Sequence, residues 1–241
     1  MIVAHRGSSY EAPENTLPAF RLAWEQGADA IEGDFHLTKD GQIVCIHDRD
    51  TERVSHTNVV VGTSTLAELR ALDVGRLYGD AFPSVAIPTI GEVFSTIPEQ
   101  KGIFIEIKSG VEIIPPLLEE IAKAGLKSEQ VMVISFNSLV LQELKAQAPQ
   151  YKTSWLRTFW TNASGVDEPS LDVVLETLER VKANGLSSGS SIPESVVEAI
   201  QARGYEWHVW TIDDLETATH IQARGVTSIT TNRPGYIRSG C

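Results

Sequence analysis

Short apolar segments recur along the chain, and polar stretches with helical spacing separate them. Eight of these segments have the length and apolar content typical of strands, although the segment at 185–188 is weak because it is rich in Gly and Ser. They occupy residues 2–4, 30–34, 103–108, 131–136, 153–157, 185–188, 207–211 and 228–231. Strands that alternate with helices in this way predict βα units around a parallel sheet.

The stretch after the first strand shows the helical pattern. Leu17, Phe20 and Trp24 fall on one helix face at a spacing of three to four residues. Asn15 or Thr16 stands just before this face, and either side chain could cap the helix. The pattern therefore predicts a helix that packs this face against the sheet.

Two further helix starts are indicated by paired residues. Thr89 and Glu92 have the spacing of a capping box, and so do Ser191 and Glu194. Pro193 also suits the first turn of the second helix. We expect both helices to begin at these pairs.

Residues 35–87 interrupt the alternation. The turn-forming residues 39–42 lie between two short apolar segments, which predicts a hairpin instead of a helical crossover. A short helix follows, with Thr65 and Glu68 at capping-box spacing. Without this insertion eight βα units remain, the number in a closed (β/α)₈ TIM barrel of roughly 250 residues. We therefore expect residues 1–241 to form one α/β barrel domain, with a hairpin and a short helix inserted after the second strand.

Composition narrows the class of protein. The chain has 241 residues, of which 42% are hydrophobic and 22% charged, so it has enough apolar material for a core and is not a disordered chain. The formal net charge of −12 argues against a nucleic-acid partner, which normally meets a basic surface. It leaves an anionic substrate open, because a metal ion and a few Arg or Lys side chains can set the local field.

Targeting signals are absent from the sequence. No run approaches the roughly 18 apolar residues of a membrane helix. Charged residues at His5 and Arg6 precede any apolar region, so we expect no signal peptide and no membrane partner. Cys45 and Cys241 are too few for a disulfide framework, and a cytoplasmic location is the default expectation.

Ionic residues stand where several strands end. Glu32 and Asp34 follow the second strand's apolar start, and Glu106 and Lys108 do so in the third. The strand period of two puts the members of each pair on one side. Each pair alone could be a surface feature or an intrastrand ion pair. If both pairs point inward, three carboxylates share one crevice, and a hard divalent cation (Mg²⁺, Mn²⁺ or Ca²⁺) is the simplest neutralising partner.

His5 and His47 are the second candidate pair. His5 ends the first strand, and His47 follows the hairpin, which would return it over the barrel mouth. Two imidazoles beside a metal suit paired general acid and base, because His titrates near neutral pH. The other histidines lack such company and are expected to be structural or on the surface. They are His36, His56, His208 and His220.

These residues belong to a longer ordered set of motifs. The set comprises His5-Arg6-Gly7, Pro13-Glu14-Asn15-Thr16 with Ala19-Phe20, Glu32-Gly33-Asp34, Leu37-Thr38-Lys39-Asp40-Gly41, His47-Asp48, Ile87-Pro88-Thr89, Glu106-Ile107-Lys108, Ser135-Phe136, Trp210-Thr211 and Thr231-Asn232-Arg233-Pro234. With this set, spread over nearly its whole length, the chain resembles the glycerophosphodiester phosphodiesterases. One departure is Gly33, where many members of the family carry a larger apolar residue, and we expect looser packing behind it.

The resemblance implies a (β/α)₈ barrel that hydrolyses glycerophosphodiesters, such as glycerophosphocholine, to glycerol 3-phosphate and an alcohol. It implies one divalent cation (Mg²⁺, Ca²⁺ or Mn²⁺) held by Glu32, Asp34 and Glu106. His5 and His47 would be the general acid and base, in an order that the sequence leaves open. The resemblance also implies that the phosphate of the substrate is bound by Arg6 and Lys108.

Supporting roles are less sharply indicated. Glu14 and Asn15 belong to a family motif beside the site, although Asn15 could equally be only a helix cap. Phe136 and Trp210 stand at strand ends and would wall the pocket or fill the barrel core. The loop at 158–169 would be a lid or a subunit contact, so a homo-oligomer is open.

Two other functions remain as alternatives. One is a related barrel that acts on lysophospholipids, which would require an apolar rim at the site, and the insertion offers little besides 59–61. The other is an inactive barrel that binds a phosphodiester. The sequence does not distinguish the leaving-group alcohols.

Overall fold

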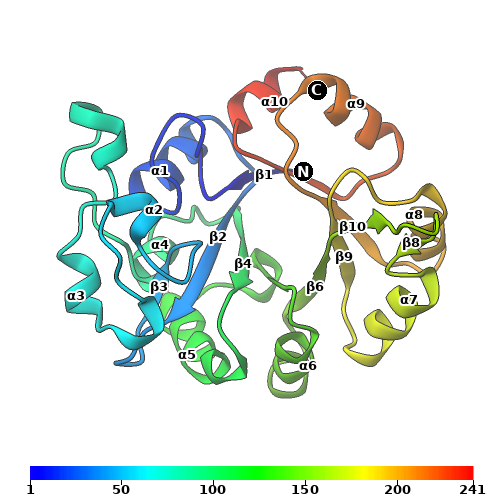
Figure 1. Ribbon diagram of the computed structural model, residues 1–241, viewed down its shortest axis with the longest axis horizontal. Helices are drawn as coiled ribbons and strands as arrows, with labels where there is room; N and C mark the ends of the chain where they lie inside the picture. The colour runs from blue at the N-terminus through cyan, green and yellow to red at the C-terminus, as the bar shows by residue number, and fades with distance from the viewer. Residues whose placement is uncertain (241) are drawn as a thin grey trace.

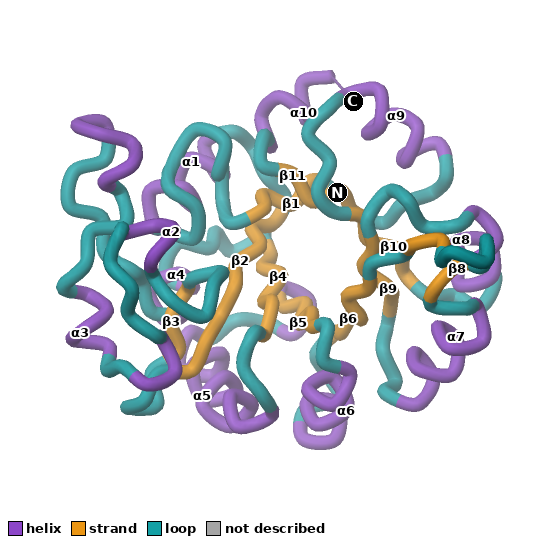
Figure 2. The backbone as a smooth tube through the Cα atoms, viewed as in Figure 1, coloured by secondary structure: helices purple, strands orange, loops and turns teal. Residues whose placement is uncertain are grey.

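The computed structural model describes residues 1–240 and contains a closed ring of eight parallel strands (Figures 1 and 2). Each strand pairs with its neighbours in chain order, and the last pairs with the first. In chain order the ring consists of β1 (Ile2–His5), β2 (Ala30–Leu37), β4 (Gly102–Ile107), β5 (Val131–Ser135), β6 (Lys152–Arg157), β9 (Gly185–Ser188), β10 (Glu206–Val209) and β11 (Ser228–Thr231). This is the (β/α)₈ barrel that the alternating pattern predicts.

All eight expected strands form, including the weak one. At Gly185 in β9 a Cβ atom would lie 2.5 Å from the backbone oxygen of Glu206 in β10, so glycine permits this close pairing. The expected strand at 207–211 is shifted and ends at Val209. Trp210 therefore lies beyond the strand, at the barrel mouth.

Helices surround the ring and cover its outer face (Figure 2). They are α1 (Leu17–Glu25), α4 (Ile90–Phe94), α5 (Ile114–Ala124), α6 (Ser138–Gln147), α7 (Leu171–Arg180), α8 (Glu194–Gln201), α9 (Leu215–Ala223) and α10 (Pro234–Gly240). Thr16 caps α1, since its hydroxyl accepts from the Ala19 N–H. Asn15 is therefore free for another role.

One of the two expected capping boxes exists. At α4, the Glu92 carboxylate accepts from the Thr89 N–H at 2.8 Å and the Thr89 hydroxyl accepts from the Glu92 N–H. The box expected at Ser191 and Glu194 is wrong: α8 begins one residue after Pro193, and no side chain caps it. The proline occupies the cap position itself, which places Ser191 two residues too early to serve the helix.

The segment between β2 and α4 forms the insertion, drawn in light blue and cyan in Figure 1. It begins with the expected hairpin, in which β3 (Ile43–Cys45) pairs antiparallel with the end of β2. The remaining elements are α2 (Glu52–Ser55), the 3₁₀ turn η1 (Val61–Thr63), α3 (Leu66–Arg70) and the 3₁₀ segment η2 (Arg76–Ala81). The expected capping box of Thr65 and Glu68 starts α3. The insertion has its own apolar cluster, which includes Val61 and Leu69.

The hydrophobic core has two further parts. A large cluster fills the space between the strands and the helices, and a smaller one, which includes Val3, Phe104 and Leu156, fills the barrel interior. Packing behind Gly33 is tight, contrary to expectation. A Cβ there would lie 3.1 Å from the Cys45 sulfur, so Phe20, Phe35 and Cys45 occupy the space that a side chain would take.

The structure also bears on membrane-spanning helices and on the cysteines. Among residues 1–240, no helix combines the length and hydropathy needed to cross a membrane. Cys45 is a free, buried cysteine. Cys241 lies outside the described residues.

The Thr89 cap generates a prediction about stability. Thr89→Ala removes one partner of the box and should lower the free energy of unfolding by about 1 kcal/mol. Ser191→Ala removes a side chain that caps nothing and should change it by less than about 0.5 kcal/mol. Urea unfolding of both variants measures the difference, and equal losses would contradict the assignment of the caps.

Candidate active site

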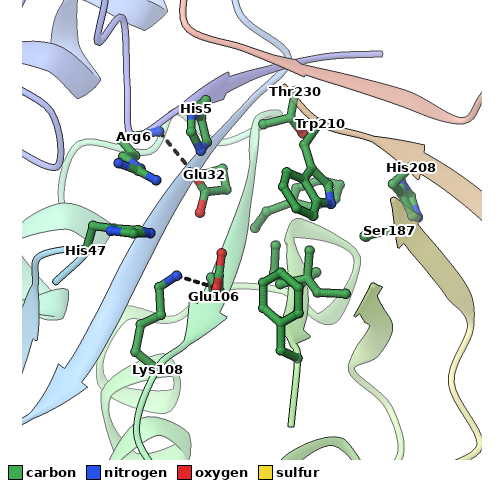
Figure 3. Close-up of a pocket in the computed structure, with 14 residues that line it drawn as sticks. His5, Arg6, Glu32, His47, Glu106, Lys108, Ser187, His208, Trp210 and Thr230 are labelled. Carbon is green, nitrogen blue, oxygen red and sulfur yellow. Dashed lines mark hydrogen bonds and ion pairs between the residues drawn. The ribbon is translucent and has the colours of Figure 1, made fainter. Parts of the chain in front are cut away.

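A cavity of about 150 Å³ opens where the barrel strands end (Figure 3). Charged side chains occupy one side of it, and Trp210 and His208 lie on the other. Its lining combines His5, Arg6, Glu32, His47, Phe104, Glu106, Lys108, Ile134, Phe136, Leu156, Ser187, His208, Trp210 and Thr230. The carboxyl-end face is where barrel enzymes build their active sites.

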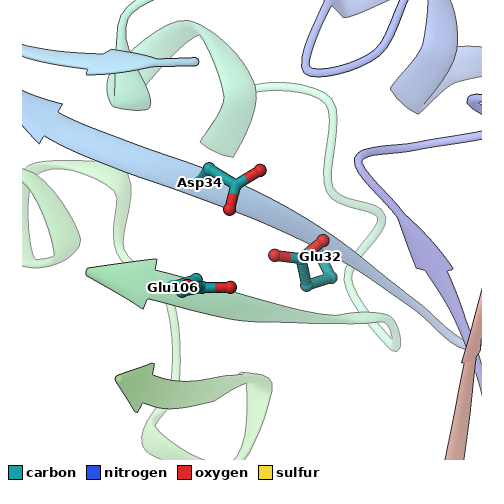
Figure 4. Close-up of side chains that lie close together, drawn as sticks. All are labelled: Glu32, Asp34 and Glu106. Atoms are coloured by element: carbon teal, nitrogen blue, oxygen red, sulfur yellow. The ribbon is translucent and has the colours of Figure 1, made fainter. Parts of the chain in front are cut away.

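Three carboxylates meet beneath this opening. Glu32 and Asp34 project from β2 and Glu106 from the adjacent β4, with their carboxyl groups turned toward one another (Figure 4). One oxygen from each lies within 4.8 Å of the others. The three residues are only 2%, 0% and 8% exposed, respectively. The parallel register places Asp34 opposite Glu106, so the pairing of two strands creates the cluster.

The electrostatics of the cluster favour a cation. Burial, together with the charges of Asp34 and Glu106, raises the pKa of Glu32 well above its ordinary value. Burial and the Asp34 charge also raise the pKa of Glu106 to about 7. One buried oxygen of Glu32 has no hydrogen-bond partner among the described residues. Such oxygens are the ligands that Mg²⁺, Mn²⁺ and Ca²⁺ prefer, so the three residues fit a divalent cation.

Two positive side chains flank the carboxylates. Arg6 Nε lies 3.1 Å from Asp34 Oδ2, and Lys108 Nζ lies 3.0 Å from Asp34 Oδ1 and 2.5 Å from Glu106 Oε1. Although burial opposes it, these two cations lower the pKa of Asp34 to about 2. Arg6 and Lys108 also line the cavity, where they can meet an anionic substrate.

The turn after β1 positions Arg6. Its backbone has a φ of 55°, and its N–H donates to Glu32 Oε2 at 3.0 Å. At Gly7 a Cβ would lie 2.6 Å from the Ala19 backbone, and the φ of 82° is one that glycine readily adopts. Glycine therefore lets this turn press against α1 and hold Arg6 over the carboxylates.

His5 is oriented by residues from the far end of the chain. Its Nδ1 lies 2.7 Å from Asn232 Oδ1, and the Asn232 amide group donates to Asp213 Oδ2 at 2.6 Å. Because that amide is held by a carboxylate, its oxygen faces His5, and His5 Nδ1 must carry the proton. Burial, with Arg6 adding to it, lowers the pKa of His5, so its Nε2 keeps a lone pair.

His47 is oriented differently. It follows β3 of the insertion, and its Nδ1 lies 2.7 Å from a carboxylate oxygen of the adjacent Asp48. His36, which the sequence left as structural or surface, is buried in β2, and its Nε2 lies 3.1 Å from the His47 backbone oxygen. The contact with Asp48 fixes the orientation of the ring, and His47 also lines the cavity.

The motif residues Glu14 and Asn15 both contact site residues. Glu14 accepts from Arg6 Nη1 at 3.0 Å. Asn15 donates to Asp34 Oδ2 at 2.8 Å and accepts from the Asp34 backbone N–H at 3.1 Å. Since Thr16 caps the helix, Asn15 serves to hold Asp34 in place.

An apolar wall faces the charged groups. The Phe136 and Trp210 rings meet edge to face with centroids 5.8 Å apart, and Phe136 is 44% exposed. Both therefore wall the cavity instead of filling the barrel core. Deeper in the barrel, Ser187, His208 and Thr230 also line the cavity. No motif pointed to these three, because single inward-facing polar residues carry no pattern.

The loops around the mouth carry exposed apolar side chains. Phe136, Leu139 and Trp160 follow strands of the barrel, and Leu77 lies in the insertion. Within the expected 59–61 rim, Val60 is exposed but Val61 is buried. The loop at 158–169 contains the two-stranded hairpin of β7 (Trp160–Thr161) and β8 (Asp167–Glu168). Its role as a lid or a subunit contact stays a prediction.

Comparison with known proteins agrees with these features. Residues 5–236 match the model of the glycerophosphoryl diester phosphodiesterase family. A glycerophosphodiester phosphodiesterase of Caldanaerobacter subterraneus subsp. tengcongensis is 36% identical over 97% of this chain and 94% of its own length.

Solved structures with the same fold include a phosphodiesterase of Oleispira antarctica in complex with its product sn-glycerol-3-phosphate. It is 28% identical with a TM-score of 0.89, and the match covers 100% of this chain and 96% of that one. The glycerophosphodiester phosphodiesterase of Thermotoga maritima is 28% identical with a TM-score of 0.79, over 99% and 96% of the two chains. The match of residues 5–236 to the family model and the shared barrel show that the chain is a hydrolase that belongs to the glycerophosphoryl diester phosphodiesterase family.

Proposed function

We propose that the protein hydrolyses glycerophosphodiesters to glycerol 3-phosphate and an alcohol. The observation that carries this proposal is the cavity itself, in which a buried carboxylate cluster lies between two cationic side chains and two histidines. The names of the relatives and the product bound in the Oleispira antarctica structure support the same substrate class.

The charges of the site suit a phosphodiester. Three ionised carboxylates against Arg6 and Lys108 leave one negative charge, which repels an anion. A divalent cation held by Glu32, Asp34 and Glu106 would turn this into one positive charge and supply a Lewis acid for the phosphoryl oxygens. The balance then matches the single negative charge of the substrate.

Arg6 and Lys108 would hold the phosphoryl group from the same side. A guanidinium offers a planar pair of donors, and an ammonium offers a compact charge. Both side chains are already fixed by ion pairs to Asp34, so little rotamer freedom is lost when substrate binds.

The two histidines divide the proton transfers. His5 keeps its Nε2 lone pair because its proton is on Nδ1, which donates to Asn232 Oδ1, so it acts as the base that removes the proton from the glycerol 2-hydroxyl. The hydroxyl oxygen then bonds to phosphorus and the bond to the alcohol breaks. His47, paired with the Asp48 carboxylate, gives its Nε2 proton to that departing oxygen. Water opens the resulting cyclic phosphate with the two roles reversed.

A lysophospholipid is the second candidate substrate. The exposed apolar ring of Phe136, which lines the cavity, favours it, because an acyl chain needs an apolar rim. Release of an acylated glycerol 3-phosphate and the free alcohol from a lysophospholipid, at a rate equal to the turnover of soluble glycerophosphodiesters, would support this candidate. Folded protein that releases product from neither would indicate an inactive, phosphodiester-binding barrel.

Removal of metal tests the reaction class. Protein stripped with a chelator should release no glycerol 3-phosphate from glycerophosphocholine or glycerophosphoethanolamine, because its carboxylate cluster would repel the substrate. Added Mg²⁺, Mn²⁺ or Ca²⁺ should restore release. An enzyme-coupled assay for glycerol 3-phosphate measures this, and full activity of the stripped protein would refute the metal dependence.

Glu106→Gln tests the ligand set. The amide keeps the size of the side chain but removes its charge, so calorimetric affinity for Mn²⁺ should fall by about 10-fold or more. Glu112→Gln, which alters an exposed acidic residue outside the cluster, is the matched control and should bind as wild type does. Unchanged affinity in Glu106→Gln would remove Glu106 from the site.

A substrate with a better leaving group separates the two histidines. His47→Ala should lower kcat for glycerophosphocholine by about 10²–10⁴, because choline needs a proton to leave. With the para-nitrophenyl ester of glycerol 3-phosphate, whose leaving group departs as an anion, the loss should be less than about 10-fold. His5→Ala should lose about 10²–10⁴ with both substrates, since each needs the base. The reverse pattern would exchange the two roles.

A further inference from the structure

Arg53 of the insertion joins two parts of the active site. It lies in the single-turn helix α2, and no sequence motif used above includes it. Its Nη1 and Nη2 groups donate to the two carboxylate oxygens of Glu14 at 2.8 and 2.7 Å. Its Nε donates to Asp48 Oδ2 at 2.6 Å. One guanidinium therefore engages two carboxylates at once.

Each of these carboxylates holds a residue of the proposed machinery. Asp48 uses its other oxygen to contact His47 Nδ1 at 2.7 Å. Glu14 Oε1, which Arg53 also contacts, accepts from Arg6 Nη1 at 3.0 Å. Two short chains of contacts thus run from Arg53, one through Asp48 to His47 and the other through Glu14 to Arg6.

We propose that Arg53 is a positioning residue that sets the orientation of His47 through Asp48 and of Arg6 through Glu14. This rests on the proposed role of His47 as the general acid. His47 lies on the insertion, outside the barrel strands, so its ring needs an anchor to the barrel mouth. Arg53 supplies that anchor, because Glu14 follows β1 of the barrel and Asp48 follows β3 of the insertion.

The shape of the side chain explains why arginine occupies this position. A guanidinium presents a fork of two Nη donors on one edge and Nε on another, which matches one bidentate and one single contact. A lysine ammonium cannot reproduce that geometry at two separate carboxylates. The apolar cluster of the insertion does not include Arg53, because it consists of other residues such as Val61 and Leu69. The Arg53 side chain itself is 46% exposed.

The test compares Arg53→Ala and Arg53→Lys with Arg49→Ala. Arg49 precedes α2, is exposed and forms no ion pair within residues 1–240, so it is the matched control and should keep full activity. Arg53→Ala should lower kcat for glycerophosphocholine by about 10–100-fold. With the para-nitrophenyl ester the loss should be smaller than with glycerophosphocholine, because that substrate does not use the general acid. Arg53→Lys should recover less than half of the lost kcat, since its charge is kept but its fork is lost.

A merely structural role predicts another result. Partial unfolding would reduce the turnover of both substrates by the same factor, and it would lower the midpoint of urea unfolding. Equal losses on the two substrates, or full activity in Arg53→Ala, would overturn the proposal. If His47→Ala itself shows no difference between the substrates, the assignment of His47 as the acid fails first. If His47→Ala shows the difference and Arg53→Ala does not, only the role of Arg53 fails.

A second variant examines the link between Arg53 and His47. Asp48→Asn keeps the size of the side chain but weakens its contacts with both Arg53 and His47. In this background Arg53→Ala should lower kcat for glycerophosphocholine by a smaller factor than it does in the wild type. The reason is that one of the two chains of contacts from Arg53 is already weakened. If Arg53→Ala lowers kcat by the same factor in both backgrounds, Arg53 does not act through Asp48.

Discussion

The site depends on one physical constraint: three buried carboxylates each place an oxygen within 4.8 Å of the other two. Ionised groups repel strongly at such distances in a low dielectric, so the cluster needs either positive charge beside it or a bound proton. The protein supplies part of that charge from Arg6 and Lys108, which bracket Asp34 on both of its oxygens. The raised pKa values of Glu32 and Glu106 mark the part that these two side chains do not neutralise. The arrangement thus fits a further cation, and on the proposed function a divalent cation would reverse the sign of the site toward its substrate.

The barrel and the loops contribute different things to this site. The acids lie on β2 and β4, where strand pairing fixes their spacing, and the Asn15 side chain also holds Asp34. His5 and His47, the proposed proton-transfer groups, lie at the end of β1 and beyond β3, and neighbouring side chains fix their orientation. Asn232 and Asp213 set His5, and Asp48 sets His47. The acids are therefore placed mainly by strand pairing, whereas the two imidazole rings are oriented by hydrogen bonds.

This difference explains what could be predicted from the sequence. Strand periodicity determines which side chains share a face. It therefore predicts one crevice, provided that both pairs point inward, for Glu32, Asp34, Glu106 and Lys108. The eight strands followed from the same kind of local pattern. The contact of His5 with Asn232 joins residues 227 positions apart, and only the closure of the barrel brings them together. The failed capping box at Ser191 has a local cause, since a proline two residues later takes the cap position.

The two sides of the cavity differ in polarity, an arrangement that suits a polar substrate held partly away from water. Charged groups gather on one side, and the Phe136 and Trp210 rings form the other. If the substrate binds as proposed, the rings would restrict water near its phosphoryl group, which would strengthen the ion pairs across from them. On the proposed function, selectivity for the alcohol would come from the residues that meet the departing group, and the loops that follow the strands, such as the one that carries Phe136, are the candidates. Variation in those loops can change the substrate while the charge balance beneath stays the same.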